Sequence, residues 1–223
     1  MPNWNPGSRA VLRLPALALA LSLAGLATAH AHHVMGGQTP ATFVQGLLSG
    51  LGHPVIGIDH LAFIVAMGVA VGVAGLSLAI PALFIVASAL GVALHVRGIA
   101  LPNAEFIVAA SVLLVGAAVA SGRAMRTSSW TPGWASSWTW GWAALFAIAG
   151  LFHGYAFGES IFGAEPTPLA AYLLGLVIIQ GALATGIALV ARRSSAGAVQ
   201  PRLAGAVIAG IGLAVLAGQL VPA

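Results

Sequence analysis

Residues 52–63 read Gly52-His53-Pro54-Val55-Ile56-Gly57-Ile58-Asp59-His60-Leu61-Ala62-Phe63 and lead into an apolar run that continues to Val73. They place two histidines and an aspartate in an otherwise membrane-like segment, in a chain with only four acidic residues. Ionisable side chains are costly inside a bilayer and most often belong to an ion or proton path. The alternative is a structural role, with His53 capping a helix and Asp59 bonded to a neighbouring backbone or hydroxyl group.

Composition identifies the chain as an integral membrane protein. Of its 223 residues, 60% are hydrophobic and 5% are charged, whereas a soluble domain carries about 25% charged residues. The net charge of +4 comes from arginines spread along the chain. We therefore expect a lipid bilayer as the partner and no nucleic acid, which would need a basic cluster with interleaved aromatic residues. Because the chain has no cysteine, any metal must be bound by imidazole, carboxylate, thioether or backbone groups.

The first 31 residues have the layout of a secretory signal peptide. Arg9 and Arg13 precede an apolar run, and small residues follow it up to Ala31. The alternative is an uncleaved anchor helix, and both place the next segment in the periplasm because the arginines stay in the cytoplasm. Cleavage after Ala29 would expose an amino terminus that can wrap Ni(II) or Cu(II) in a square plane. The candidate capture residues are His30, His32 and His33, unless this is an ordinary cleavage region that happens to contain histidine.

The rest of the chain is expected to be all-α, as one integral membrane domain over residues 32–223. Its apolar segments have the ~20-residue length that a membrane-spanning helix needs. A short re-entrant or interfacial helix is predicted at 42–52, with Pro54 near a helix start and Pro81 inside the second span. Six spans are predicted, at about 57–74, 77–97, 102–121, 139–162, 167–191 and 202–221.

Arginines predict the orientation of this bundle in the cytoplasmic (inner) membrane. Five fall in two loops that become cytoplasmic when the mature amino terminus is periplasmic, and only Arg97 falls outside, as the positive-inside rule requires. The two stripes of small residues, Gly68 with Gly72 and the triple at 150, 154 and 158, predict that spans one and four pack closely together. All the acids and all the histidines beyond the amino-terminal segment then gather in the outer leaflet: His53, Asp59, His60, His95, Glu105, His153, Glu159 and Glu165.

Helical geometry limits how the first motif could bind an ion. On a regular helix His53 and His60 share a face but lie two turns apart, which is too far for both to reach a metal bonded at ~2 Å. Either Pro54 and Gly57 break the helix so that His53 folds inward, or the two histidines mark successive stops on a path. Asp59 could orient His60 by accepting its second N–H. Met67 continues the same face, as a soft ligand or, as we favour, as core packing.

A second motif, Phe152-His153-Gly154-Tyr155-Ala156-Phe157-Gly158-Glu159-Ser160, combines imidazole, carboxylate and hydroxyl groups. Ser160 shares the face of His153, whereas Glu159 is rotated from it by about 100°. The alternative is a buried histidine bonded to a neighbouring carbonyl. Histidines and carboxylates without cysteine suit Ni²⁺, Co²⁺, Zn²⁺ or Cu²⁺ better than Mg²⁺ or Ca²⁺, and they do not select one of the four. We take His53, Asp59, His60, His153 and Glu159 as metal candidates, with Glu105, His95, Ser160 and Met67 as secondary path candidates.

These motifs resemble those of the HupE/UreJ family of small membrane proteins, which is linked to nickel supply for hydrogenase and urease. The matching parts are the signal-like start, His53-x5-Asp59-His60, Glu105 before Phe106–Leu113, and Phe152-His153-Gly154-x-Ala156-x-Gly158. The resemblance covers nearly all of the mature chain. It implies a six-helix nickel permease in which both histidine motifs and the acid after His153 are needed for uptake. The family acid falls where this chain has Ser160, and the adjacent Glu159 would suit a subgroup that prefers cobalt or copper.

We therefore expect a divalent-metal permease, with Ni²⁺ as the favoured ion and no permanent cofactor. The expected protein partners are hydrogenase or urease maturation proteins. The sequence has no Gly-rich ATP-binding loop, so transport would be facilitated diffusion or secondary coupling. The alternative is a non-transporting accessory protein that holds metal for metalloenzyme assembly. An enzyme is not expected, because the His-Glu-x-x-His helix of many metallohydrolases is absent from the sequence.

Overall fold

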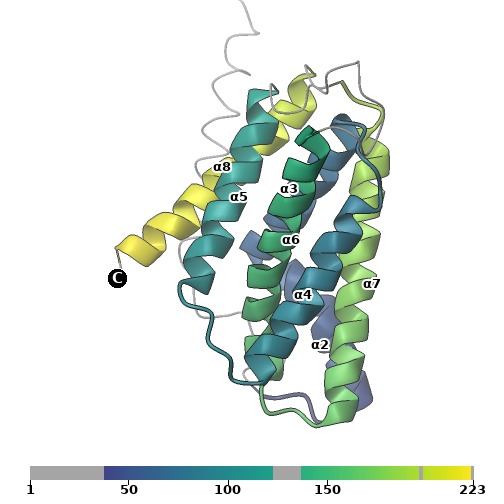
Figure 1. Ribbon diagram of the computed structural model, residues 1–223, viewed down its shortest axis with the longest axis vertical. Coiled ribbons are helices and arrows are strands. Elements are labelled where there is room, and N and C mark those ends of the chain that lie inside the picture. The colour runs from purple at the N-terminus through teal and green to yellow at the C-terminus, as the bar shows by residue number, and fades with distance from the viewer. Residues whose placement is uncertain (1–37, 123–136, 196–197, 222–223) are drawn as a thin grey trace, which may run out of the picture.

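The computed structural model describes residues 38–122, 137–195 and 198–221, and all regular structure in these ranges is helical (Figure 1). The expected all-α fold is therefore confirmed. The predicted signal peptide and the histidines His30, His32 and His33 lie outside the described residues. In chain order the elements are α2 (Phe43–Ile56), α3 (Ile58–Val73), α4 (Ile80–Val96), α5 (Ala104–Ser121), α6 (Ser137–Gly158), the 3₁₀ turn η3 (Glu159–Ile161), α7 (Pro166–Ala191) and α8 (Val199–Leu220).

Four of these helices, α5 to α8, are long and apolar enough to cross a membrane individually. Helices α2 and α3 are long enough only together, as a pair bent by 76°, which makes a fifth candidate span. Helix α4 is apolar but has 17 residues, fewer than the ~20 that usually cross a bilayer. The described residues thus provide four or five candidate spans, where the sequence predicted six.

The bent pair follows α7 along its whole length. Gly50 of α2 lies against the backbone of Tyr172 near the start of α7, whereas Gly72 of α3 lies against Ala188 near its end. The sequence predicted a short helix at 42–52 before a first span at 57–74, and the structure has both helices with a later end to the first. Helix α2, capped by Thr42, continues to Ile56, and the break falls at Gly57.

Two prolines also differ from expectation. Pro54 lies in the last turn of α2 rather than at a helix start. Pro81 lies at the first turn of α4, where its missing N–H costs no helical hydrogen bond, so it does not kink the helix interior. The break at Gly57 is therefore the feature that bends the chain near the two histidines of the first motif.

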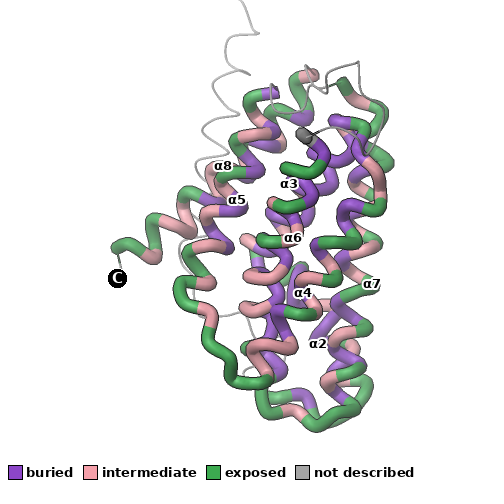
Figure 2. Tube along the Cα trace, in the orientation of Figure 1, coloured by how far each residue is buried: buried purple, intermediate pink, exposed green. Residues whose placement is uncertain are grey.

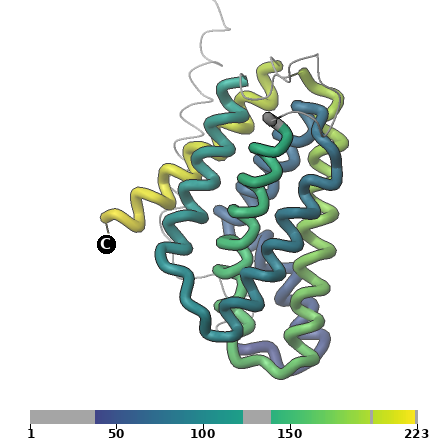
Figure 3. The backbone as a smooth tube through the Cα atoms, viewed as in Figure 1, coloured from purple at the N-terminus to yellow at the C-terminus, as the bar shows by residue number. Residues whose placement is uncertain are grey.

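Glycines bring the other helices together in pairs, and Figure 3 shows α4 beside α6 and α5 beside α8. Gly154 of α6 lies against the backbone of Ser88 in α4, and Gly212 of α8 lies against that of Leu113 in α5. Gly68 of α3 meets the side chain of Ile187 in α7. The prediction that the glycine stripes of spans one and four face each other is thus wrong, because each stripe packs on a different neighbour.

The core lies where α3 runs through the centre of the bundle, and the helices around it bury their inner faces (Figure 2). Phe63, Ile64 and Met67 of α3 are fully buried. Phe84 stacks on Phe63 with ring centroids 5.2 Å apart. These side chains form a continuous apolar layer next to the polar end of α3, which begins with Asp59 and His60.

Candidate metal site

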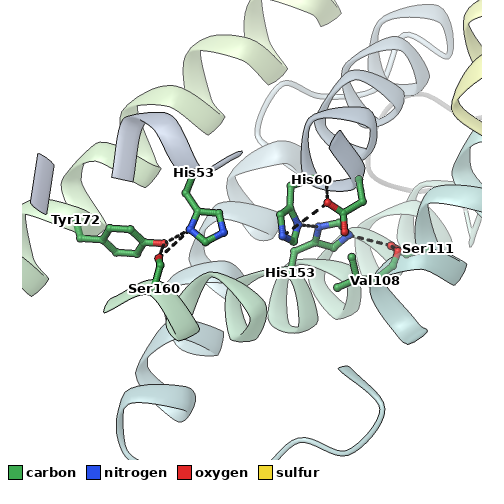
Figure 4. Close-up of polar contacts among 8 residues, drawn as sticks. His53, His60, Val108, Ser111, His153, Ser160 and Tyr172 are labelled. Carbon is green, nitrogen blue, oxygen red and sulfur yellow. Dashed lines mark hydrogen bonds and ion pairs between the residues drawn. The ribbon is translucent and has the colours of Figure 1, made fainter. Parts of the chain in front are cut away.

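Three buried imidazoles converge from three helices. His53 comes from the end of α2, His60 from the first turn of α3 and His153 from the last third of α6. The ring centroids of His53 and His60 are 5.8 Å apart, and those of His60 and His153 are 5.0 Å apart. Figure 4 shows His60 between the other two, so the two sequence motifs form one cluster.

The break at Gly57 creates this arrangement. It bends the chain by 76° between α2 and α3, so that His53 and His60 become neighbours rather than lying two turns apart on one helix. Of the two geometries that the sequence left open, the broken helix is confirmed. A Cβ at Gly57 would lie 2.7 Å from Cδ2 of His60, so a larger residue there would displace this imidazole.

His60 and His153 are joined in a directed chain of hydrogen bonds. Ser111 donates to the carbonyl of Val108 at 2.7 Å, and its Oγ is 3.0 Å from Nε2 of His153. With its proton directed to Val108, Ser111 accepts from His153 Nε2–H, which leaves His153 Nδ1 as an acceptor when the ring is neutral. His60 Nδ1, 2.9 Å from that atom, then donates to it. This series of hydrogen bonds therefore places the ring lone pair of a neutral His60 on Nε2.

His53 is held by two hydroxyl groups on its other side (Figure 4). Its Nδ1 lies 2.8 Å from Ser160 Oγ and 3.1 Å from Tyr172 OH. Tyr172 donates to the carbonyl of Phe157 at 2.7 Å, and Ser160 donates to the same carbonyl at 3.2 Å. With both hydroxyl protons directed there, His53 Nδ1–H is the donor to the hydroxyl oxygens. Such a bond to a second-layer oxygen is how proteins orient a metal-binding histidine.

Asp59 adds a negative charge at the edge of the cluster. Its side chain is 15% exposed, and Oδ1 accepts from the backbone N–H of His60 at 2.8 Å. The same oxygen is 4.0 Å from Nε2 of His60. His53 also lies in the last turn of α2, where the helix dipole favours positive charge. Both effects make the cluster attractive to a cation.

Aromatic rings enclose the imidazoles. The ring of Phe157 lies 5.2 Å from His53 and 4.4 Å from His60 between centroids. On the other side, Phe63 lies 4.5 Å from His153. Apolar walls of this kind exclude water and strengthen the electrostatic interactions inside the cluster.

The comparisons with known proteins agree with the motifs. Residues 17–215 match the family described as HupE / UreJ protein. The chain belongs to the HupE/UreJ family. It is 31% identical over 202 residues to Protein HupE of Rhizobium leguminosarum bv. viciae, covering 89% of this chain and 94% of that protein. No solved structure matches the chain.

Of the remaining predicted residues of this HupE/UreJ protein, the structure places Ser160 at the cluster and the others outside it. Ser160 is buried and contacts His53, whereas Glu159 beside it is exposed. Glu105 and Glu165 are exposed at the starts of α5 and α7. His95 packs on Tyr155 and Phe162, away from the three imidazoles. Met67 is fully buried in the apolar core, as favoured.

Sequence reasoning missed two members of the cluster, Ser111 and Tyr172. Tyr172 is fully buried on α7 and Ser111 is 7% exposed on α5. Neither belongs to a histidine motif, and hydroxyl residues are common between membrane helices. A signal was nevertheless present, because Tyr172 is one of only two tyrosines in the chain and lies inside an apolar span.

Proposed function

We propose that the protein is a cytoplasmic-membrane permease that carries a divalent metal ion, with Ni²⁺ favoured, from the periplasm to the cytoplasm for hydrogenase or urease maturation. In this proposal the bent pair α2–α3 and the shorter α4 complete a bundle of six spans, with the mature amino terminus in the periplasm. The observation that carries it is the convergence of three buried imidazoles from separate helices beside a carboxylate. Such groups are costly in a bilayer and mark ion pathways.

Asp59 and His60 supply the first ligands. With the proton of His60 on Nδ1, its Nε2 and the Asp59 carboxylate are two electron-pair donors 4.0 Å apart. A cation can bind between these two atoms, either as a proton on Nε2 or as a metal bonded at about 2.0–2.2 Å to each atom at a wide angle. Metal binding there displaces a proton, so we expect uptake to weaken as the periplasm is acidified.

His53 supplies a third ligand from the other side. Its Nδ1 faces Ser160 and Tyr172, and its second ring nitrogen lies on the side of His60 in Figure 4. Among the described residues no three His, Asp or Glu side chains already surround a common point. We therefore propose that metal binding draws His53 and His60 together by movement at Gly57. In a chain cleaved after Ala29, His30 would begin the terminus that captures the ion first, together with His32 and His33.

A second candidate function is a protein that holds the metal for transfer to a metalloenzyme, without transport. The observation that favours it is the aromatic layer beside His153. Phe63 stacks on Phe84 with centroids 5.2 Å apart and meets Phe146 at 6.2 Å, and all three rings are fully buried. A permease must move these rings during each transport cycle, whereas a holding protein need not.

Ion flux into vesicles distinguishes the two functions. Purified protein would be reconstituted into liposomes that contain a metal-sensitive dye, and Ni²⁺, Co²⁺, Zn²⁺ and Cu²⁺ would be added outside, singly and in competition. We expect saturable Ni²⁺ entry that exceeds entry into empty liposomes and is lost in Asp59→Ala. Tight Ni²⁺ binding without entry would instead support the holding protein. A preference for Co²⁺ or Cu²⁺ would correct the proposed metal and keep the permease.

A further inference from the structure

A second buried polar pair lies next to the histidine cluster. Gln180 of α7 is fully buried and Ser88 of α4 is 1% exposed. Gln180 Nε2 donates to Ser88 Oγ at 3.3 Å. The other end of the amide, Oε1, is buried and has no hydrogen-bond partner in the part of the chain that the structure describes. Neither residue belongs to the two histidine motifs.

Helix packing places this pair within about one turn of the imidazoles. Helices α3 and α7 run in the same direction, because Gly68 meets Ala184 and Gly72 meets Ala188. This register puts Gln180 level with Ile64, about one turn, or ~6 Å, further along α3 than His60. On the opposite side, the backbone of Ser88 lies against Gly154, the residue after His153.

An interhelical hydrogen bond explains the amide nitrogen of Gln180 but not its amide oxygen. Amide and hydroxyl side chains often join membrane helices, and the contact to Ser88 serves that purpose between α7 and α4. It leaves the carbonyl oxygen without a partner in a region where each unsatisfied polar atom is costly. A leucine or methionine would fill the same space without this cost. A bound ligand would give this buried oxygen the partner that it lacks among the described residues.

We propose that Gln180 Oε1 and Ser88 Oγ form a second binding position for a partly hydrated divalent cation after it leaves the histidines. Both groups are neutral oxygen donors, which bind borderline divalent metals more weakly than imidazole does. Weak ligands suit an intermediate position, because conduction requires that the ion enter favourably and still leave. This inference rests on the proposed transport function and adds a stop on its path beyond the histidine cluster.

The test compares metal binding with flux in Gln180→Leu. Ni²⁺ affinity is measured by titration calorimetry in detergent, and the initial rate of Ni²⁺ entry is measured in liposomes. Gln180→Leu retains the histidine cluster, so we expect wild-type affinity for the first ion together with a loss of entry rate of about tenfold or more, the scale of supporting polar groups at metal sites. The matched control is Gln200→Leu, the same change at an exposed position of α8, which should alter neither quantity.

A second variant keeps the test decisive if Gln180→Leu folds poorly. Gln180→Glu retains the oxygen and adds a charge, so we expect a second Ni²⁺ bound per chain and slower entry, because the ion leaves the position less readily. Unchanged flux in Gln180→Leu would overturn the inference. A loss of Ni²⁺ affinity and thermal stability in both variants, in step with the loss of flux, would show a purely structural role and overturn it too. Absence of flux in the wild type would instead overturn the permease, and with it this second position.

Discussion

Helix pairs α4–α6 and α5–α8 pack in the same way but bury different side chains. In both, a glycine of one helix lies against the backbone of the other: Gly154 on Ser88 in the first pair and Gly212 on Leu113 in the second. The first pair buries His153 and Ser88, whereas the buried positions of α8 are only Pro201, Gly205, Ile208 and Gly212. Close glycine packing is therefore a general scaffold of this bundle, and function depends on which side chains it brings inward.

The bend between α2 and α3 explains why one pair became the site. It directs His53 and His60 toward α6, so His153 finds polar neighbours across the bundle. Helix α5 contributes Ser111, whose hydroxyl donates to the carbonyl of Val108 in the same helix. Substitutions at matched positions of the two pairs can therefore distinguish effects on helix packing from effects on metal binding.

The largest effect is expected from removing an imidazole of the cluster. His60→Ala and His153→Ala should each lower Ni²⁺ affinity and entry rate by at least ~100-fold, the upper end of effects at residues that support metal ligands. His95→Ala, which removes the same side chain from α4 at a place outside the cluster, should retain both within about threefold. Titration calorimetry and liposome entry measure the two quantities. Equal losses in all three variants would contradict the assignment of the site to the three central imidazoles.

Hydroxyl groups that hold His53 should have the next largest effect. Tyr172→Phe and Ser160→Ala each remove a partner of His53 Nδ1, and we expect a loss of about tenfold in Ni²⁺ affinity, within the 10–100-fold range of such supporting contacts. Ser121→Ala is the matched control, because Ser121 bonds a backbone carbonyl of α5 at an exposed position. Wild-type affinity in both Tyr172→Phe and Ser160→Ala would show that the orientation of His53 does not matter for metal binding.

The sequence predicted the polar cluster better than the helices that form it. Apolar runs located the long helices, and the motifs supplied His53, Asp59, His60 and His153. What they could not supply was the partner of each helix, because a glycine stripe specifies close approach and not which backbone approaches. Tyr172 was missed for the same reason: its role exists only because α2 packs on the start of α7.

The end of α6 illustrates a different limit. The helix stops at Gly158 and continues as a 3₁₀ turn over Glu159–Ile161. A 3₁₀ turn advances 120° per residue instead of 100°, so facing directions extrapolated from the α-helix change there. Ser160 was correctly placed on an inward face, but its imidazole partner is His53 rather than His153. Which of Glu159 and Ser160 faces the imidazoles therefore could not be read from the sequence.

Glycine substitutions test the scaffold directly and should have a smaller effect on metal binding. A Cβ at Gly154 or Gly212 would collide with the opposite backbone, and overpacking of this kind costs about 1–3 kcal/mol of stability. We expect similar falls in melting temperature in detergent for Gly154→Ala and Gly212→Ala. Only Gly154→Ala should also lower Ni²⁺ affinity, by a few fold, because it displaces α6 next to His153. Equal affinity losses in the two variants would mean that the pairs are not functionally distinct.

The smallest effect is expected at the exposed acids, one beside each helix pair. Glu159 follows α6 and Glu105 lies in the first turn of α5, and both side chains are exposed to the surroundings. Glu159→Gln and Glu105→Gln should each change Ni²⁺ affinity and entry rate by less than about twofold, because a charge in a polar environment interacts weakly with an ion inside the cluster. Measuring both at low salt makes the comparison most sensitive, since screening is then weakest. A large loss in Glu159→Gln alone would show that the end of α6 turns this carboxylate inward during transport. The acid would then act on the moving ion, even though Ser160 occupies the inner position in the structure described here.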